Sequence, residues 1–277
     1  MAVTVLRNNP EPEEGLKIYS QQEMMVVAAS RLLRNNEKVL VGTGIPLVGA
    51  ILAKNTHAPE IVILMEAVAF DSDPQALPFC VADPRAVYKT RWVPTAVEVM
   101  GQFLQSGDVD TGFLGGSQVD RYGNLNSTFV GGDYFSPHKR FEGSGGACDI
   151  AALSGRTIII IAHEKRRFVE TVDYITSPGW KCRDLTGKNM VDRESIGLRG
   201  GPYAVVSTLG VMKFDPQTHE MYVDGYYADL GVSLEQIKEE TAFDIDVSRA
   251  NPVSSPLTQE LNALRSKVDP EGIYMKY

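Results

Sequence analysis

One glutamate, Glu66, directly follows the continuous apolar run Ile61-Val62-Ile63-Leu64-Met65. Such a run is typical of a strand buried on both faces of a parallel sheet. Ligands of open α/β sheets bind at the carboxyl ends of the strands, where a carboxylate can act as a base or a nucleophile. From position alone an alternative is equally open, namely that Glu66 caps a turn or pairs with a nearby arginine.

Two glycine-rich segments could bring backbone N–H groups close to a ligand. Gly115-Gly116-Ser117-Gln118 follows the apolar run Val109–Leu114, and Gly143-Ser144-Gly145-Gly146-Ala147 precedes four consecutive isoleucines. Paired glycines after a strand suit an oxyanion hole, so the backbone around Gly116 and Ser117 is the first candidate. The alternative for the first segment is a surface loop, and for the second a place where two loops pass closely. Neither is a phosphate-binding loop, because no GK[ST] follows, and Gly42-Thr43-Gly44 is only a fragment of a dinucleotide fingerprint.

A third candidate is the cationic run Lys165-Arg166-Arg167, which follows the isoleucine strand and could meet a phosphate or carboxylate. A solvated or interface-facing charge run is the alternative. The four histidines show no HxxxH spacing and no GxSxG elbow is present, so the sequence supports neither a metal site nor a serine nucleophile. The three cysteines are isolated, which favours a reducing compartment over a disulfide framework.

Composition narrows the classes of partner. The 277 residues include 35 acidic and 27 basic side chains, for a formal charge of −8. This balance gives no global attraction for nucleic acid or anionic lipid. We find neither a signal peptide nor an apolar run near the roughly 20 residues of a membrane span, and we expect a cytoplasmic protein.

The elements that would position these residues alternate between apolar strands and helical segments. Strands are expected at 38–42, 61–65, 109–114 and 157–162, which predicts an α/β fold with a mostly parallel central sheet flanked by helices. A capping box at Ser20–Glu23 predicts a helix to about Asn35, and another predicts a short helix after Ser233. We expect strands at 204–214 and 220–226, and a last helix at 257–267. Residues 1–19 are interpreted as an arm, and 20–277 as one domain.

Several long segments make the chain resemble the B (β) subunits of the family I CoA-transferases, the group that includes glutaconate CoA-transferase. The resemblance covers nearly the whole chain after the arm. Its marks are VGTGIPL at 41–47, GGSQVDRYGNLNS at 115–127, RFEGSGGA at 140–147, HEKRRF at 163–168 and DYITSPGW at 173–180.

The resemblance implies the CoA-transferase fold and a half-enzyme that is active only with an A (α) subunit, in a hetero-oligomer whose active site lies between the two subunits. Glu66 occupies the place of the family's catalytic glutamate, which exchanges acyl groups through a glutamyl-CoA thioester. Acyl-CoA and a carboxylic acid would be the substrates, with no permanently bound cofactor and no metal. Besides Gly115, Gly116, Ser117 and Gln118, we expect Gly44, Val68, Gly145 and Gly146 to contact CoA or the partner.

One departure keeps a second enzyme class open. Family transferases usually follow the glutamate with Ser-Gly or Asn-Gly, whereas this chain has Ala67-Val68. Valine resists backbone conformations that glycine permits, and it could crowd the thioester. Relatives with this fold open a cyclic diketone on a steroid-derived CoA thioester by hydrolysis, or decarboxylate an acyl-CoA, and there Glu66 would act as a base or a polarising group. A third hypothesis is a purely structural partner of an A subunit.

Overall fold

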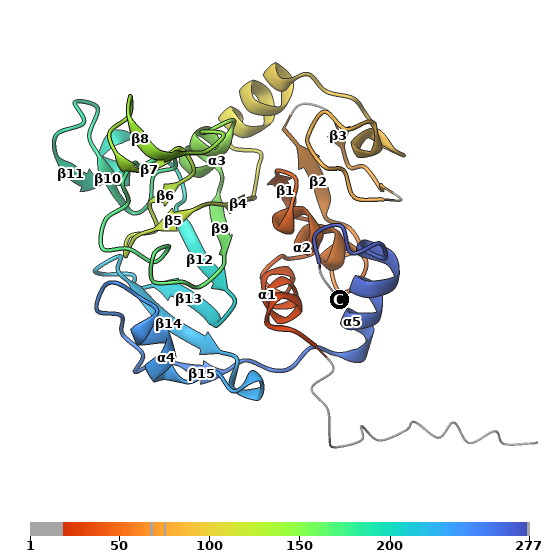
Figure 1. Cartoon of the computed structure of the whole chain (residues 1–277). Helices are drawn as coiled ribbons and strands as arrows, with labels where there is room; N and C mark the ends of the chain where they lie inside the picture. The colour runs from red at the N-terminus through yellow and green to blue at the C-terminus, as the bar shows by residue number, and fades with distance from the viewer. Residues whose placement is uncertain (1–18, 67–68, 75, 276–277) are drawn as a thin grey trace, which may run out of the picture.

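The computed structural model describes residues 19–66, 69–74 and 76–275. Its centre is a nine-stranded sheet, shown in Figure 1. Across the sheet the strands are β15 (Asn251–Pro252), β14 (Met221–Tyr226), β13 (Gly210–Phe214), β12 (Pro202–Ser207), β9 (Arg156–Ile161), β4 (Thr111–Gly115), β1 (Lys38–Val41), β2 (Val62–Met65) and β3 (Ala69–Phe70).

The middle of the sheet is parallel. Strands β2, β1, β4, β9 and β12 pair in that order in parallel, while β3, β13 and β14 add antiparallel strands at the two sides. The isoleucines of β9 are all buried, as a strand covered on both faces requires. The α/β fold with a mostly parallel sheet is therefore confirmed.

Helices cover both faces of the parallel strands. Helices α1 (Gln21–Ser30) and α2 (Ile45–Lys54) pack together on one face, and α3 (Ala147–Leu153) lies on the other with the π-helical segment η2 (Val97–Leu104). Neighbouring residues of β4 show the two faces: a Cβ on Gly49 of α2 would lie 3.1 Å from the Phe113 ring, whereas a Cβ on Gly112 would overlap Ile150 of α3. Helix α5 (Thr258–Ala263) and its continuation η5 (Leu264–Val268) complete the α1 and α2 side.

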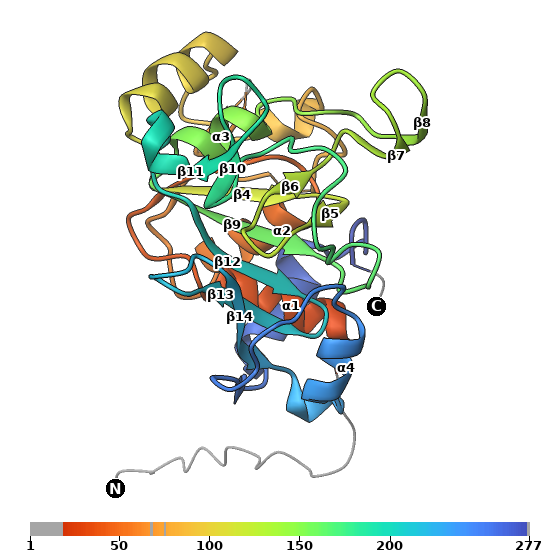
Figure 2. The ribbon, with the colours of Figure 1, turned by 90° about the vertical axis from the view of Figure 1, so that its left-hand side faces the viewer.

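The remaining elements lie beside the sheet and at its ends. Figure 2 shows the hairpin of β7 and β8 projecting from the body of the molecule. The paired strands are β5 (Gln118–Val119) with β6 (Leu125–Asn126), β7 (Phe129–Gly132) with β8 (Pro137–Arg140), and β10 (Lys181–Arg183) with β11 (Met190–Asp192). The short helices are η1 (Pro84–Val87), η3 (Arg193–Ile196), η4 (Ala228–Leu230) and α4 (Leu234–Glu239). No helix of the described ranges is long and apolar enough to cross a membrane.

Two predicted boundaries are wrong. Helix α1 begins with the expected capping box but ends at Ser30, whose hydroxyl donates to the Val27 carbonyl, and not near Asn35. The strand expected at 204–214 is two antiparallel strands, because the Ser207 hydroxyl accepts hydrogen bonds from the amides of Leu209 and Gly210 and so closes a turn. Of the arm predicted over 1–19, only Tyr19 is described, and it packs against the core.

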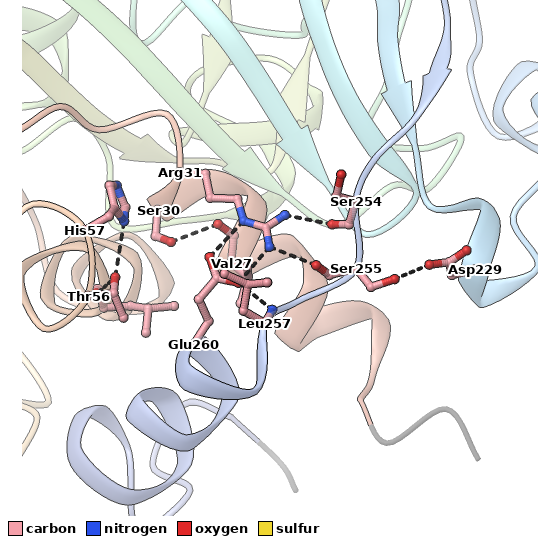
Figure 3. Close-up of polar contacts among 11 residues, drawn as sticks. Val27, Ser30, Arg31, Thr56, His57, Asp229, Ser254, Ser255, Leu257 and Glu260 are labelled. Carbon is pink, nitrogen blue, oxygen red and sulfur yellow. Dashed lines mark hydrogen bonds and ion pairs between the residues drawn. The ribbon is translucent and has the colours of Figure 1, made fainter. Parts of the chain in front are cut away.

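The ion pair of Arg31 with Glu260 joins the start of the described chain to its end (Figure 3). The Arg31 guanidinium, just after α1, donates to both carboxylate oxygens of Glu260 in α5 and to the backbone carbonyls of Ser254 and Ser255. Glu260 also accepts the amide of Leu257 and so caps its own helix. The Glu260 side chain is only 7% exposed, so its charge depends on this partner.

Replacing Arg31 by Met should therefore destabilise the fold by about 3 kcal/mol, because a buried carboxylate and two carbonyls lose their donor. Lys38→Met is the matched control: its partner Asp108 is 51% exposed, and loss of such a surface pair costs about 1 kcal/mol or less. Urea unfolding of both variants measures the difference, and equal midpoints would contradict the role given to Arg31.

Candidate active site

Glu66 directly follows strand β2. Strand β2 ends at Met65, β3 begins at Ala69, and these two residues pair directly in antiparallel orientation. Because β2 belongs to the parallel part of the sheet, Glu66 lies at the edge where the carboxyl ends of the strands meet.

The Glu66 carboxylate lies against the second glycine-rich segment. A Cβ placed on Gly145 would be 3.5 Å from Glu66 Oε1, and a Cβ on Gly146 would overlap that same oxygen. Met100 of η2 comes to the same point, with its Cε 2.8 Å from where that Gly146 Cβ would lie. Only a residue without a side chain fits at 146 while Glu66 holds this position.

The glycine turn also presents backbone donors. Gly143 and Gly145 adopt positive φ angles of 96° and 48°, and the Ser144 carbonyl accepts the amide of Ala147. No acceptor within the described ranges takes the amides of Gly145 or Gly146, and no described cation pairs with Glu66. A partly buried carboxylate without a cation partner can attack an acyl carbon, and amides without an acceptor can stabilise the oxyanion that forms.

Two residues of the first glycine-rich segment, Ser117 and Gln118, form hydrogen bonds within the fold. The Ser117 amide and hydroxyl both donate to the Asn126 carbonyl, each at 2.8 Å, so neither is available to an oxyanion. The Gln118 side-chain carbonyl oxygen accepts from the Asn126 side chain and from the Asp173 amide. These two residues tie their loop to β6 and to the segment around Asp173, and the described contacts do not bring them to Glu66.

Gly115 and Gly116 instead line a cavity at the carboxyl edge. Its volume is about 470 Å³, and Ile45, Pro46 and Ile160 form much of the rest of its wall. In the sheet, β1 has β2 as its neighbour on one side and β4 on the other, so the strand order reverses at β1. The cavity lies beside the ends of β1 and β4, and α/β sheets bind ligands at such a reversal. A larger cavity of about 720 Å³ lies beside β10, and Glu66 is among the lining residues of neither cavity.

Gly44 and Val68 are two further positions predicted to contact CoA or the partner. Gly44 has a φ of 93° and is the residue before α2, and its carbonyl accepts the first helical hydrogen bond, from Val48. It therefore starts the helix that leads away from the carboxyl edge. Val68 lies outside the described residues, as does Ala67, so its proximity to the thioester stays a prediction.

Both arginines of the cationic run pair with one carboxylate of the same segment. Arg166 and Arg167 both pair with Glu164, and the Lys165 amide donates to Glu240. His163 is buried between Ser207 and Thr241, and burial lowers its pKa to about 3. Lys165 and Arg166 are exposed, as expected for a solvated or interface-facing charge run. Among the described residues no three His, Cys, Asp or Glu side chains are grouped to hold a metal.

Two parts of the site leave no clear signal in the sequence. Met100 contacts the glycine turn from η2, whose only visible mark is the pairing of Thr95 with Glu98 at its start. Asp71, just after β3, is buried and bound to Lys54 and Arg91. The contacts of Met100 and Asp71 join segments that are far apart in the chain, so local patterns do not reveal them.

Comparisons with known proteins agree with this geometry. A family model described as Coenzyme A transferase matches residues 22–240. The B subunit of glutaconate CoA-transferase from Acidaminococcus fermentans is 40% identical over 264 residues, which cover 93% of this chain and 96% of that one. The chain belongs to the coenzyme A transferase family. The B subunit of 3-oxoadipate CoA-transferase from Pseudomonas knackmussii is 35% identical, with 91% and 94% covered.

The family assignment extends to the three-dimensional structure. The crystal structure of glutaconate CoA-transferase from A. fermentans superposes with a TM-score of 0.82 at 38% identity, covering 94% of this chain and 98% of that one. Relatives named as a ring-cleaving hydrolase subunit and as a decarboxylase are more distantly similar. The chain thus has the CoA-transferase fold, and it resembles transferase B subunits more than the alternative enzymes.

Substituting Gly146 by Ala tests the contact with Glu66. The added methyl group would displace the carboxylate, and misplacement of a reacting group by about 1 Å can lower turnover by about 10²-fold. Gly101→Ala is the control, because a Cβ there meets only Val97 at 3.8 Å. Steady-state CoA-transfer rates and circular dichroism are compared for both. Wild-type turnover in Gly146→Ala would show that Glu66 does not act from this position.

Proposed function

We propose that this chain is the B subunit of a heteromeric acyl-CoA:carboxylate CoA-transferase in which Glu66 is the nucleophile. The observation that supports this most is the placement of the Glu66 carboxylate: at the carboxyl edge of the sheet, without an ion pair among the described residues, and against the Gly145–Gly146 turn. The similarity to two transferase B subunits supports the same reaction.

The reaction follows from the chemistry of a carboxylate and a thioester. A Glu66 oxygen attacks the thioester carbonyl, the C–S bond breaks, and CoA leaves as a thiolate from a mixed anhydride. The thiolate then attacks the Glu66 carbonyl carbon and releases the first carboxylic acid, leaving a glutamyl-CoA thioester. A second carboxylate reverses these steps and departs as the new CoA ester. Each attack creates an oxyanion that the free glycine amides can stabilise.

The substrates we infer are short dicarboxylic acids and their CoA esters. The names of the two relatives contain glutaconate and 3-oxoadipate, and each of these acids carries a second carboxylate besides the one that exchanges CoA. CoA enters as part of the substrate and is not a resident cofactor. A cytoplasmic location, where such thioesters are made, stays a prediction.

An A subunit is the expected partner, and one surface of this chain suits it. The hairpin of β7 and β8 carries Tyr134 and Phe135 at its tip, 49% and 92% exposed, and Tyr134 stacks edge-on against buried Phe129. Exposed aromatic clusters of this kind are typical of protein interfaces. The base of the hairpin leads directly into the glycine turn, since the Gly143 amide donates to the Ser127 carbonyl. A partner docked on the hairpin would thus contact an element of the site.

Replacing Phe135 by Asp should weaken assembly with the A subunit about tenfold or more, since interface aromatic residues often contribute over 1.4 kcal/mol. Leu185→Asp is the matched control, because Leu185 is also 92% exposed but lies between β10 and β11. Sedimentation of the mixed subunits measures both dissociation constants. Unchanged assembly in Phe135→Asp would place the interface elsewhere.

Replacing Glu66 by Gln tests the nucleophile itself. The assembled enzyme should lose CoA transfer by a factor of about 10³ or more, as expected for a covalent catalyst. Wild-type complex incubated with acyl-CoA and then with borohydride should carry an alcohol in place of the Glu66 carboxyl, located by tandem mass spectrometry. The Glu66→Gln variant cannot form the thioester and should remain unmodified.

Other results would select the other hypotheses. Net loss of acyl-CoA without transfer to an acid, and with Glu66 unmodified, would identify a hydrolase or a lyase in which Glu66 acts as a base. Full activity of the assembled Glu66→Gln enzyme would leave this chain a structural role.

A further inference from the structure

Asp71 has features that neither the fold nor the proposed chemistry requires by itself. It follows β3 directly and adopts a φ of 57°, an uncommon conformation for a residue other than glycine. Its side chain is only 3% exposed. Burying a carboxylate is costly unless it is paired, so this position needs partners.

Two cations from different elements supply those partners. Lys54, the last residue of α2, donates to Oδ1 of Asp71, and Arg91 Nε lies 2.7 Å from Oδ2. The Asp71 amide donates to the Ile63 carbonyl of β2 at 2.7 Å. Asp71 therefore ties together the end of α2, strand β2 and the segment that contains Arg91.

Phe70, the residue before Asp71, is also held by several contacts. The Phe70 amide donates to the Thr90 hydroxyl and the Trp92 carbonyl, and the Phe70 carbonyl accepts the Arg91 amide. The Phe70 ring lies near those of Trp92 and Phe103, with centroids 6.0 and 5.4 Å away. Strand β3, although only two residues long, is thus held by both backbone and ring contacts.

Strand β3 is tied to the end of β2, which Glu66 follows directly. Met65 pairs with Ala69, so a displacement of β3 breaks that pair or moves the residue before Glu66. The Glu66 carboxylate in turn has to stay clear of the Gly146 backbone and the Met100 side chain.

We infer that Asp71 is a positioning residue: its pairs with Lys54 and Arg91 fix β3, and β3 holds Glu66 in register with the glycine turn. The kinetic part of this inference rests on the proposed role of Glu66 as nucleophile. The structural part, that the position of β3 depends on Asp71, stands independently of the reaction.

The test is Asp71→Asn in the assembled complex. Asparagine tolerates positive φ, so the substitution removes the charge while it retains the backbone conformation. We expect kcat to fall about 10- to 100-fold with KM for acyl-CoA changed less than about twofold, because an orientation is lost and not a substrate contact. Formation of the borohydride-trapped Glu66 alcohol should slow by the same factor.

Asp73→Asn is the matched control. Asp73 lies two residues further on and pairs with Lys89 at 3.3 Å, but its side chain is 62% exposed. We expect kcat near that of the wild type. The double variant Asp71→Asn/Lys54→Met should be no slower than Asp71→Asn alone, because both changes disrupt one interaction.

Hydrogen exchange separates this inference from the proposed function. In Asp71→Asn, amides of the peptide spanning β2 and β3 should exchange faster than in the wild type, whatever reaction the enzyme performs. Unchanged exchange would overturn the inference even if Glu66 proves to be the nucleophile. A wild type that forms no Glu66 thioester would refute the proposed function, while faster exchange in Asp71→Asn would still support the role of Asp71. If the fall in kcat were matched by an equal loss of folded complex, Asp71 would stabilise the fold and would not position Glu66.

Discussion

The candidate site depends on a close approach between a carboxylate and a backbone without side chains. Glu66 reaches the turn at 143–146 only because Gly146 has no Cβ, and the turn has its shape only because Gly143 and Gly145 accept positive φ. Each partner comes from a different part of the sheet: Glu66 follows β2, and the turn precedes α3, which leads into β9. The arrangement of strands therefore has to be correct before the site exists.

That arrangement follows from the order in which strands join the sheet. After β1 the chain adds β2 on one side, then returns to add β4, β9 and β12 on the other. All five run in the same direction, so the loops after β1, β2 and β4 gather at one edge. Helix α3 and η2 cover the same face of the sheet, and their contact brings Met100 over the turn that receives Glu66. The fold thus brings together at one edge groups that come from distant parts of the chain.

Much of this could be predicted from the sequence, and the limits have physical reasons. Buried parallel strands read as continuous apolar runs, so β1, β2, β4 and β9 are recognisable, and Glu66 with them. The two glycine-rich segments look alike in composition, however, and only tertiary contacts distinguish them. Ser117 donates hydrogen bonds to the Asn126 carbonyl, and the Gln118 side chain accepts one from the amide of Asp173, 55 residues away. The amides of Gly145 and Gly146, in contrast, have no acceptor among the described residues. The expected strand at 204–214 is divided into β12 and β13 after Ser207, and this likewise depends on a tertiary detail. The Ser207 hydroxyl accepts hydrogen bonds from two amides, those of Leu209 and Gly210.

The charges around β3 explain why Glu66 is the carboxylate suited to chemistry. Cations are plentiful in the neighbouring segments, and an arginine bound to Glu66 would occupy the oxygen lone pairs that a nucleophile needs. Three other acids bind those cations instead: Asp71 pairs with Lys54 and Arg91, Asp73 with Lys89, and Asp83 with Arg85. Within the described ranges this leaves Glu66 unpaired and only partly buried, while the acid that anchors β3 is buried and doubly paired. The carboxylates near β3 thus differ in role because they differ in environment, one fixed by cations and one kept free of them.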